Sequence, residues 1–506
     1  MQTATPEILA FDPGALRGIL SPVPSSSAEY LLDYLSELRA ASVLHEKHYV
    51  DRHYLDDFCN YYSRSFITPN SNCERFHFFS GLDSQALDQV LDNAYSADTT
   101  LQADARAKLQ ESYLGFLVKR PLPGAPFGRT VLRTYPAEGR RHYDVVRPYA
   151  VNIAGIHLSV SGLAYQQQDR GAAVCASTAL WSALQRVSHV AGFRTPTPSM
   201  ITTASESPFP ASHGLNEMQM AHALAKLGYL ADSFAPEDNR NLFLVQLTSA
   251  LQSQLPVVLL LTRKYQTGVG ERDLGHAVTV TGFSEPQDVP DVHLGVEGIA
   301  PIRMRAGATS IIYVHDDNLG SHAHYELRLS DEKDERGNKT LILYRGRSNK
   351  PGVNWWTPDE WTVRLALVPK PPKLRLSIAS LINSLVELRT LVETLLPGIQ
   401  LDFAARFTSG VEYKRAVLEM NIDRSKVRNF LSSLSLPRQV GVFSVSDDTS
   451  HRLDIIVDVS QVEVVHGQPF VHALTAPGIP ARSPAALNLE RLATMWRIPL
   501  LLAPPT

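Results

Sequence analysis

The stretch Val174-Cys175-Ala176-Ser177-Thr178-Ala179-Leu180-Trp181 places a cysteine at the start of an apolar run that predicts a helix over about residues 173–190. The free amides and the dipole at the start of a helix stabilise a thiolate, so a cysteine there is a candidate nucleophile. A lone cysteine among alanines is more often a small buried core residue. The stretch therefore indicates a catalytic cysteine only if a base and an acid for it are found elsewhere in the chain.

A second stretch, Gly275-His276-Ala277-Val278-Thr279-Val280-Thr281-Gly282-Phe283, places a histidine at the beginning of an apolar run that predicts a β-strand. A helix from elsewhere in the fold can bring a thiol within hydrogen-bond reach of an imidazole at such a strand end. We expect Gly275 to leave room for that approach. The alternative is a core histidine that is satisfied by the backbone.

A third stretch, Ile311-Ile312-Tyr313-Val314-His315-Asp316-Asp317-Asn318-Leu319-Gly320, predicts a strand that ends in two carboxylates and a turn. Either carboxylate could accept the second N–H of an imidazole and fix its tautomer. Either one could instead cap the turn, as aspartates before Asn and Gly commonly do.

Taken together, the three stretches resemble the papain-like cysteine peptidases, and most closely their bacteriocin-processing, double-glycine-peptidase branch. In that branch a glutamine precedes a helix-opening cysteine, a Gly-His pair opens a strand, and a later strand ends in Asp before a turn. The resemblance covers about residues 151–367. This chain has Ala176 where the family usually has Gly after the cysteine, and Asp317 where it usually has Pro after the acid.

The resemblance implies a role for each of four residues. Cys175 is the expected nucleophile, His276 the base, Asp316 the acid and Gln168 the donor to the oxyanion. Asp317 stays open as the acid, and Gln166 and Gln167 stay open as the oxyanion donor.

The function that the resemblance implies is that of a cysteine-dependent hydrolase, a peptidase or isopeptidase, which works through a thioester intermediate on a protein or peptide substrate. An acyl transferase of transglutaminase type would use the same groups. A papain-like scaffold that binds without catalysis is the second alternative. No cofactor is expected.

The length of 506 residues suggests about three domains, at roughly 100 to 200 residues each. We expect an α+β fold: a mixed α/β domain of unknown role over 1–150, a papain-like central domain with a helical part and an antiparallel sheet over 151–368, and an α+β domain over 373–506. Successive prolines in Pro369-Lys370-Pro371-Pro372 mark the last boundary. Within the C-terminal domain we predict helices over 378–395 and after Ser483, and strands over 411–420, 440–446 and 453–459.

Composition excludes several other classes of function. The net charge of -3 provides no basic field for nucleic acid, and no apolar stretch is long enough to span a membrane. The three cysteines are too few for a disulfide framework, which favours a cytoplasmic location. The spacing of Cys59 and Cys73 fits no compact zinc motif, so we expect no metal site. The sequence makes no prediction of the oligomeric state.

Overall fold

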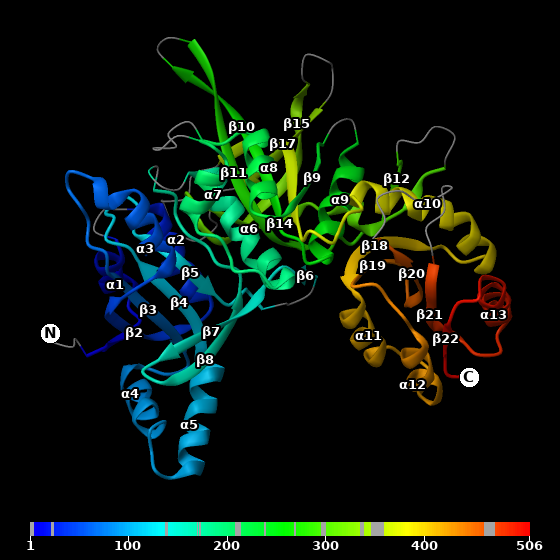
Figure 1. Ribbon diagram of the computed structural model, residues 1–506, viewed down its shortest axis with the longest axis horizontal. Coiled ribbons are helices and arrows are strands. Elements are labelled where there is room, and N and C mark those ends of the chain that lie inside the picture. The colour runs from blue at the N-terminus through cyan, green and yellow to red at the C-terminus, as the bar shows by residue number, and fades with distance from the viewer. Residues whose placement is uncertain are drawn as a thin grey trace.

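The computed structural model shows three parts in chain order, with the N-terminal part on one side of the central part and the C-terminal part on the other (Figure 1). The residues that it describes are 5–21, 25–136, 140–169, 171, 174–207, 214–236, 239–267, 270–294, 300–333, 339–345, 359–459 and 471–505. Helices and antiparallel sheets occur in all three parts, which confirms the α+β class.

The N-terminal part is a five-stranded antiparallel sheet in the order β1-β2-β3-β4-β5, with helices α1 to α5. The strands are β1 (Glu7–Ala10), β2 (Ala40–Tyr49), β3 (Cys73–Ser80), β4 (Tyr113–Lys119) and β5 (Phe127–Leu132), and the helices are α1 (Pro13–Leu20), α2 (Ser26–Glu37), α3 (Arg52–Asn60), α4 (Ser84–Asn93) and α5 (Thr99–Ser112), with a short 3-10 turn η1 (Tyr62–Arg64). The hairpin of β7 (Arg147–Ile153) and β8 (Ile156–Gly162) follows. The predicted boundary at residue 150 lies inside β7.

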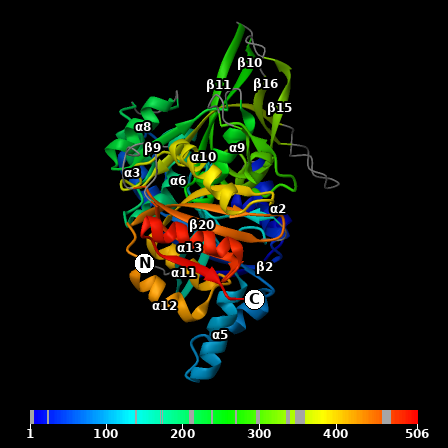
Figure 2. The same cartoon turned by 90° about the vertical axis from the view of Figure 1, so that its right-hand side faces the viewer.

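The centre of the molecule is a closed ring of antiparallel strands. Strands β10, β11, β14, β15, β16 and β17 pair successively, and β17 pairs back with β10. The bounds are β10 (Val257–Thr267), β11 (Gly270–Ser284), β14 (Ile311–Asp316), β15 (Gly320–Lys333), β16 (Lys339–Arg345) and β17 (Asp359–Lys370). Two short strands join this sheet, since β9 (Leu230–Phe234) pairs with β17 and β6 (Arg141–His142) with β11. Figure 2 shows β10 and β11 extending together from the end of the molecule opposite α5.

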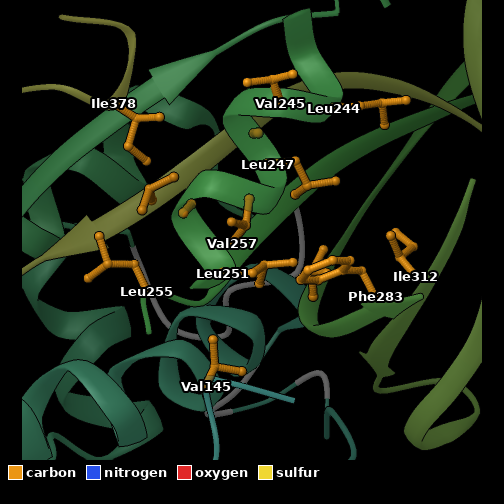
Figure 3. Close-up of a cluster of buried hydrophobic side chains, with 14 of the residues drawn as sticks. Val145, Leu244, Val245, Leu247, Leu251, Leu255, Val257, Phe283, Ile312 and Ile378 are labelled. Atoms are coloured by element: carbon orange, nitrogen blue, oxygen red, sulfur yellow. The ribbon is translucent and has the colours of Figure 1, made fainter. Parts of the chain in front are cut away.

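Four helices accompany the ring: α6 (Cys175–Ala191), α7 (Pro198–Ala204), α8 (Glu217–Lys226) and α9 (Arg240–Gln252). The predicted helix at 173–190 is confirmed as α6. Every residue of α9 from Phe243 to Leu251 is buried. Figure 3 shows its leucines in the same apolar cluster as Phe283 of β11 and Ile312 of β14. This cluster holds the two strands that carry the predicted base and acid. The remaining short elements are β12 (Asp291–Val292), β13 (Ile302–Arg303) and the 3-10 turn η2 (Arg305–Ala308).

The C-terminal part is a five-stranded sheet in the order β18-β19-β20-β21-β22. Its elements are α10 (Ile378–Leu395), β18 (Asp402–Ser409), α11 (Gly410–Glu419), α12 (Arg424–Ser433), β19 (Gln439–Ser446), β20 (His451–Asp458), β21 (Val471–Pro480), α13 (Pro484–Trp496) and β22 (Leu500–Ala503). The predicted helices at 378–395 and after Ser483, and the strands at 440–446 and 453–459, are confirmed.

The predicted strand at 411–420 is wrong, because this segment is helix α11. The Ser409 hydroxyl accepts a hydrogen bond from the Glu412 amide and caps the helix. Tyr413 and Val417 are buried four residues apart, whereas Val411 is 62% exposed. Burial thus follows the helical period rather than the alternation of a strand.

Among the residues that the structure describes, no helix combines the length and the apolarity needed to cross a bilayer.

Candidate active site

Cys175 is the first residue of α6, the helix that the sequence predicts to carry the nucleophile. Its side chain is half-buried, whereas the following residues from Ala176 to Ser188 are all buried. The first amides of a helix have no partner within the helix. The thiol is therefore the accessible end of an otherwise buried helix and lies beside free N–H groups.

His276 lies on β11, which packs directly against α6. The Thr279 hydroxyl donates a hydrogen bond of 2.8 Å to the Ala179 carbonyl and so ties the strand to the first turns of the helix. The Cys175 thiol lies close enough to the imidazole to raise its pKa. Gly275 is not needed for this approach, because a Cβ atom at that position would meet no atom within 4 Å.

Asp316 ends β14, the neighbour of β11 in the ring. Its Oδ1 atom lies 3.0 Å from His276 Nε2 and also accepts a hydrogen bond of 3.0 Å from the Asn318 amide. Oδ2 accepts a hydrogen bond of 2.5 Å from the Tyr325 hydroxyl. Asp316 therefore caps its own turn and orients the imidazole at the same time, so the two alternatives for this residue are compatible.

The tautomer of His276 follows from these contacts. Since Nε2 faces the carboxylate of Asp316, a neutral imidazole donates its Nε2 proton there and leaves Nδ1 as the base for the thiol. This is the arrangement that general-base activation of Cys175 requires.

Electrostatics favour a charged imidazole. Burial lowers the pKa of His276, but the charge and hydrogen bond of Asp316, the nearby Cys175 thiol and the charge of Asp317 raise it, and the result lies well above its ordinary value. Burial likewise acts to raise the pKa of Asp316, but the imidazolium and the hydrogen bonds from His276 and Tyr325 hold it well below its usual range. The imidazolium and the Asp316 carboxylate thus stabilise each other.

Asp317 is buried next to the same imidazole but is held differently. Its Oδ1 atom is 3.8 Å from His276 Nε2, and neither carboxylate oxygen has a hydrogen-bond partner among the described residues. Burial raises the pKa of Asp317 to about 7, with the charge of Asp316 acting in the same direction and His276 against it. Of the two candidate acids, Asp316 has the geometry that orients a base.

The three candidate glutamines have different surroundings. Gln168 Nε2 donates to Asn318 Oδ1 over 3.2 Å, and Asn318 Nδ2 lies 3.4 Å from His276 Nε2. Gln167 Oε1 accepts a hydrogen bond of 3.0 Å from the Phe127 amide. Gln166 Nε2 is buried and has no partner among the described residues. The structure thus connects Gln168 to the imidazole through Asn318.

Helix α2 of the N-terminal part holds the turn that carries Asp316 and Asn318. The Ser27 hydroxyl donates to the Asn318 carbonyl over 3.1 Å, and the Tyr30 hydroxyl donates to the Ser321 carbonyl over 2.9 Å. A Cβ atom at Gly320 would lie 2.2 Å from the Tyr30 ring, so only glycine permits this close packing.

Two further aromatic residues complete the surroundings of the site, and the sequence analysis missed both. The ring of Trp361 on β17 lies 5.1 Å from that of His276, centroid to centroid, and the Tyr325 hydroxyl accepts a hydrogen bond of 3.2 Å from Arg345. Nothing near Cys175, His276 or Asp316 in sequence signals them, because they lie on other strands of the ring.

The only group of three potential metal-donor residues that converges among the described parts of the chain is His276, Asp316 and Asp317, with donor atoms within 4.8 Å of one another. Here the His276 and Asp316 atoms already bond to each other. Cys59 is exposed and Cys73 is buried, and both are free thiols.

Comparison with protein-family models and with curated proteins finds no match for this chain.

Proposed function

We propose that this chain is a cysteine-dependent hydrolase, a peptidase or isopeptidase with a papain-like central domain. One observation carries the proposal: a buried imidazole lies between the thiol of Cys175, at the start of a helix, and the carboxylate of Asp316, at the end of a neighbouring strand. Three elements that are far apart in sequence thus supply nucleophile, base and orienting acid in the order that a Cys-His-Asp triad needs.

In the proposed reaction His276 Nδ1 takes the Cys175 proton, and the thiolate attacks the carbonyl carbon of the amide. The imidazolium then gives its proton to the leaving nitrogen, the C–N bond breaks, and a thioester remains. His276 next takes a proton from water, the hydroxide attacks the thioester carbonyl, and the carboxylic acid leaves as the thiolate re-forms. Asp316 stabilises the imidazolium throughout without itself taking the proton.

The negative charge that develops on the carbonyl oxygen when the thiolate attacks needs hydrogen-bond donors to stabilise it. The Cys175 amide at the open end of α6 is one, because the first amides of a helix lack internal partners. Gln168 is our proposal for the second, because its Nε2 group has another N–H beyond the one given to Asn318. The buried, unpartnered Nε2 of Gln166 is the competing donor.

The experiment that tests the proposal is alkylation with iodoacetamide near neutral pH, followed by peptide mass spectrometry. Exposed Cys59 serves as the reference within the same chain. We expect Cys175 to react at least about tenfold faster than Cys59, because a neighbouring base takes the proton from the attacking thiol. Equal rates, or labelling of Cys175 that is unchanged in His276→Ala, would support an inactive binding module instead.

Hydrolysis and acyl transfer share every step up to the thioester. Mass spectrometry of the products of a library of peptides, with and without a primary amine, separates them: a hydrolase gives the acid, and a transferase of transglutaminase type gives the new amide. Cys175→Ala is the control for both.

A further inference from the structure

A cleft of about 690 Å³ lies where the N-terminal part meets the turn after β14. Its lining includes the first residues of α2, the turn Leu122–Pro126, Gln168, Asp317 and Asn318. Asn318 connects this lining to the site, because its Nδ2 atom is 3.4 Å from His276 Nε2. A molecule that contacts Asn318 in the cleft would lie one side chain away from the imidazole.

Asp317 is the unusual member of this lining. Its side chain is almost fully buried, yet neither carboxylate oxygen has a hydrogen-bond partner among the described residues. Burial of an ionised carboxylate without a partner is costly, and such a group is normally paired or hydrogen-bonded. In contrast, the carboxylate of Asp316, one residue earlier, has hydrogen-bond partners in His276, the Tyr325 hydroxyl and the Asn318 amide. Asp317 is therefore an acid in need of a partner.

The charges around the cleft point to the kind of partner. Its described lining includes Asp317 and Asp169 but no Lys, Arg or His. Asp169 already faces Arg120, with Oδ2 3.6 Å from Nη1. The remaining polar lining is largely serine hydroxyls, which bind charged and neutral groups alike. Within the described lining, Asp317 is thus a carboxylate without a hydrogen-bond partner, and the His276 ring is 3.8 Å from it.

The reacting groups do not satisfy this anion. The His276 imidazole is 3.8 Å from Asp317 Oδ1 but bonds at 3.0 Å to Asp316, so its charge is shared with the nearer carboxylate. A bound cation would favour the ionised form of Asp317, whose pKa of about 7 already lies close to neutrality.

We propose that this cleft is the subsite for a primary ammonium group of the substrate, an N-terminal α-amine or a lysine side chain, which forms an ion pair with Asp317. This rests on the proposed function, because it assigns a substrate class, an amine-bearing peptide, to the same site. The hydroxyls of α2 and the backbone of the Leu122–Pro126 turn then contact the polar chain next to the ammonium group.

Two thiol reagents of similar size test the proposal without a known substrate: 2-aminoethyl methanethiosulfonate, which is cationic, and methyl methanethiosulfonate, which is neutral. Each forms a disulfide with a thiolate and releases methanesulfinate. The rate of the cationic reagent divided by that of the neutral one is measured at Cys175 and normalised to the same ratio at exposed Cys59. We expect a normalised ratio of about ten in the wild type at pH 7.5, as a nearby unpaired carboxylate gives.

Asp317→Asn keeps the shape of the side chain and removes the charge, so the normalised ratio should fall to about one. Asp273→Asn is the matched control, since it removes the same charge from an exposed position on the strand of His276, outside the described lining of the cleft. We expect this control to keep the wild-type ratio. A ratio that stays near ten in Asp317→Asn, or falls equally in Asp273→Asn, overturns the proposal.

A measurement on the wild type covers the case in which Asp317→Asn does not fold. Butylammonium chloride should slow the reaction of Cys175 with the neutral reagent, and 1-butanol at the same concentration should not; equal effects overturn the proposal. Failure of the proposed function is distinguishable, because it appears in the absolute rate at Cys175 relative to Cys59. The charge ratio is independent of that rate.

Discussion

The substitution Asp316→Asn removes one negative charge from the buried site and leaves the shape of the side chain. In the wild type the carboxylate lies 3.0 Å from His276 Nε2, accepts hydrogen bonds from Tyr325 and the Asn318 amide, and contributes most to the raised pKa of the imidazole. Asparagine can keep the hydrogen bond from the Asn318 amide through its Oδ1 atom, and its NH2 group then faces the Tyr325 hydroxyl, which can accept a hydrogen bond. The change therefore tests mainly the charge.

The expected size of the effect follows from the separation of the charges. Two unit charges about 4 Å apart interact by about 4 kcal/mol at an effective dielectric constant of about 20, which corresponds to about three pKa units. Relaxation of the site lowers this figure, so we expect the pKa of His276 to fall and the stabilisation of the imidazolium to drop by about 3 kcal/mol. The population of the thiolate–imidazolium pair then falls about 100-fold, and the rate of alkylation of Cys175 near pH 6 falls with it.

The assay is the rate of iodoacetamide labelling of Cys175 between pH 5 and 9, read by peptide mass spectrometry, in the wild type, Asp316→Asn and Asp317→Asn. The wild-type rate should stay high at the acidic end, and the Asp316→Asn rate should be low there, because the imidazolium has lost its carboxylate partner. Asp317→Asn should change this profile by less than about tenfold, because Asp317 lies farther from the ring. A normal profile in Asp316→Asn together with a shifted one in Asp317→Asn would refute our assignment of the acid.

Other changes are expected to act as follows. Cys175→Ser should abolish turnover and shift the midpoint of thermal unfolding by only a few degrees, because the side chain is half-buried; a large loss of stability would indicate a structural thiol. Gln168→Ala should lower kcat about 100-fold with little change in KM if it donates to the oxyanion, and the same loss in Gln166→Ala instead would transfer that role. Gly320→Ala should lower both stability and turnover, because its Cβ atom would lie 2.2 Å from the α2 tyrosine ring, and wild-type behaviour in calorimetry and turnover would contradict this packing. Burial lowers the pKa of His315 to about 3, so the folded state takes up its proton only far below the ordinary histidine pKa of about 6.5; its contribution to stability is complete above pH 6.5 and falls by about 2 kcal/mol by pH 5. The free energy of unfolding in urea should therefore fall between pH 6.5 and pH 5 by about 2 kcal/mol less in His315→Gln than in the wild type. Equal losses in the two proteins would contradict the lowered pKa of His315.

Helices with one apolar face could be predicted from the sequence, and helices without such a face could not. The residues Leu31, Leu32 and Leu35 recur at helical spacing and lie buried on α2. In contrast, α9 is buried on every side from Phe243 to Leu251, so it has no polar face to reveal its period. The prediction of a strand over 411–420 was wrong because apolar residues are exposed there: Val411 and Leu418 lie on the outside of the helix and give the sequence the appearance of a strand.

Strands β2 and β3 of the N-terminal part were not predicted, because they carry charged residues that pair with each other across the two strands. His45 on β2 bonds to Glu74 on β3 over 2.7 Å, and Arg75 on β3 forms an ion pair with Glu46 on β2. In the sequence these residues look like solvated positions. The alternation of a half-buried strand is hidden until the cross-strand partner is known.

The candidate site also has residues that could be predicted from the sequence and residues that could not. Cys175 and Asp316 stand out in the sequence because each lies at the end of a helix or strand, and the fold brings both to His276. The prediction that His276 opens its strand is wrong, because β11 already begins at Gly270 and His276 lies in its interior. The supports of these three residues do not stand out, because Trp361 and Tyr325 reach the site only through the pairing of strands around the ring. The strand order, which the sequence does not reveal, decides which side chains face the imidazole.

The closed ring also separates the reacting groups into two cooperative units. His276 and Asp316 lie on neighbouring strands of a circuit without a free edge, so neither strand can fray alone, and their amides should exchange with solvent only when the whole ring opens. Cys175 lies outside that circuit, on the first turn of a helix, where opening costs least. The base and its acid should therefore remain assembled while the nucleophile moves, so that slow fluctuations of one helix end determine when the thiol is competent to react.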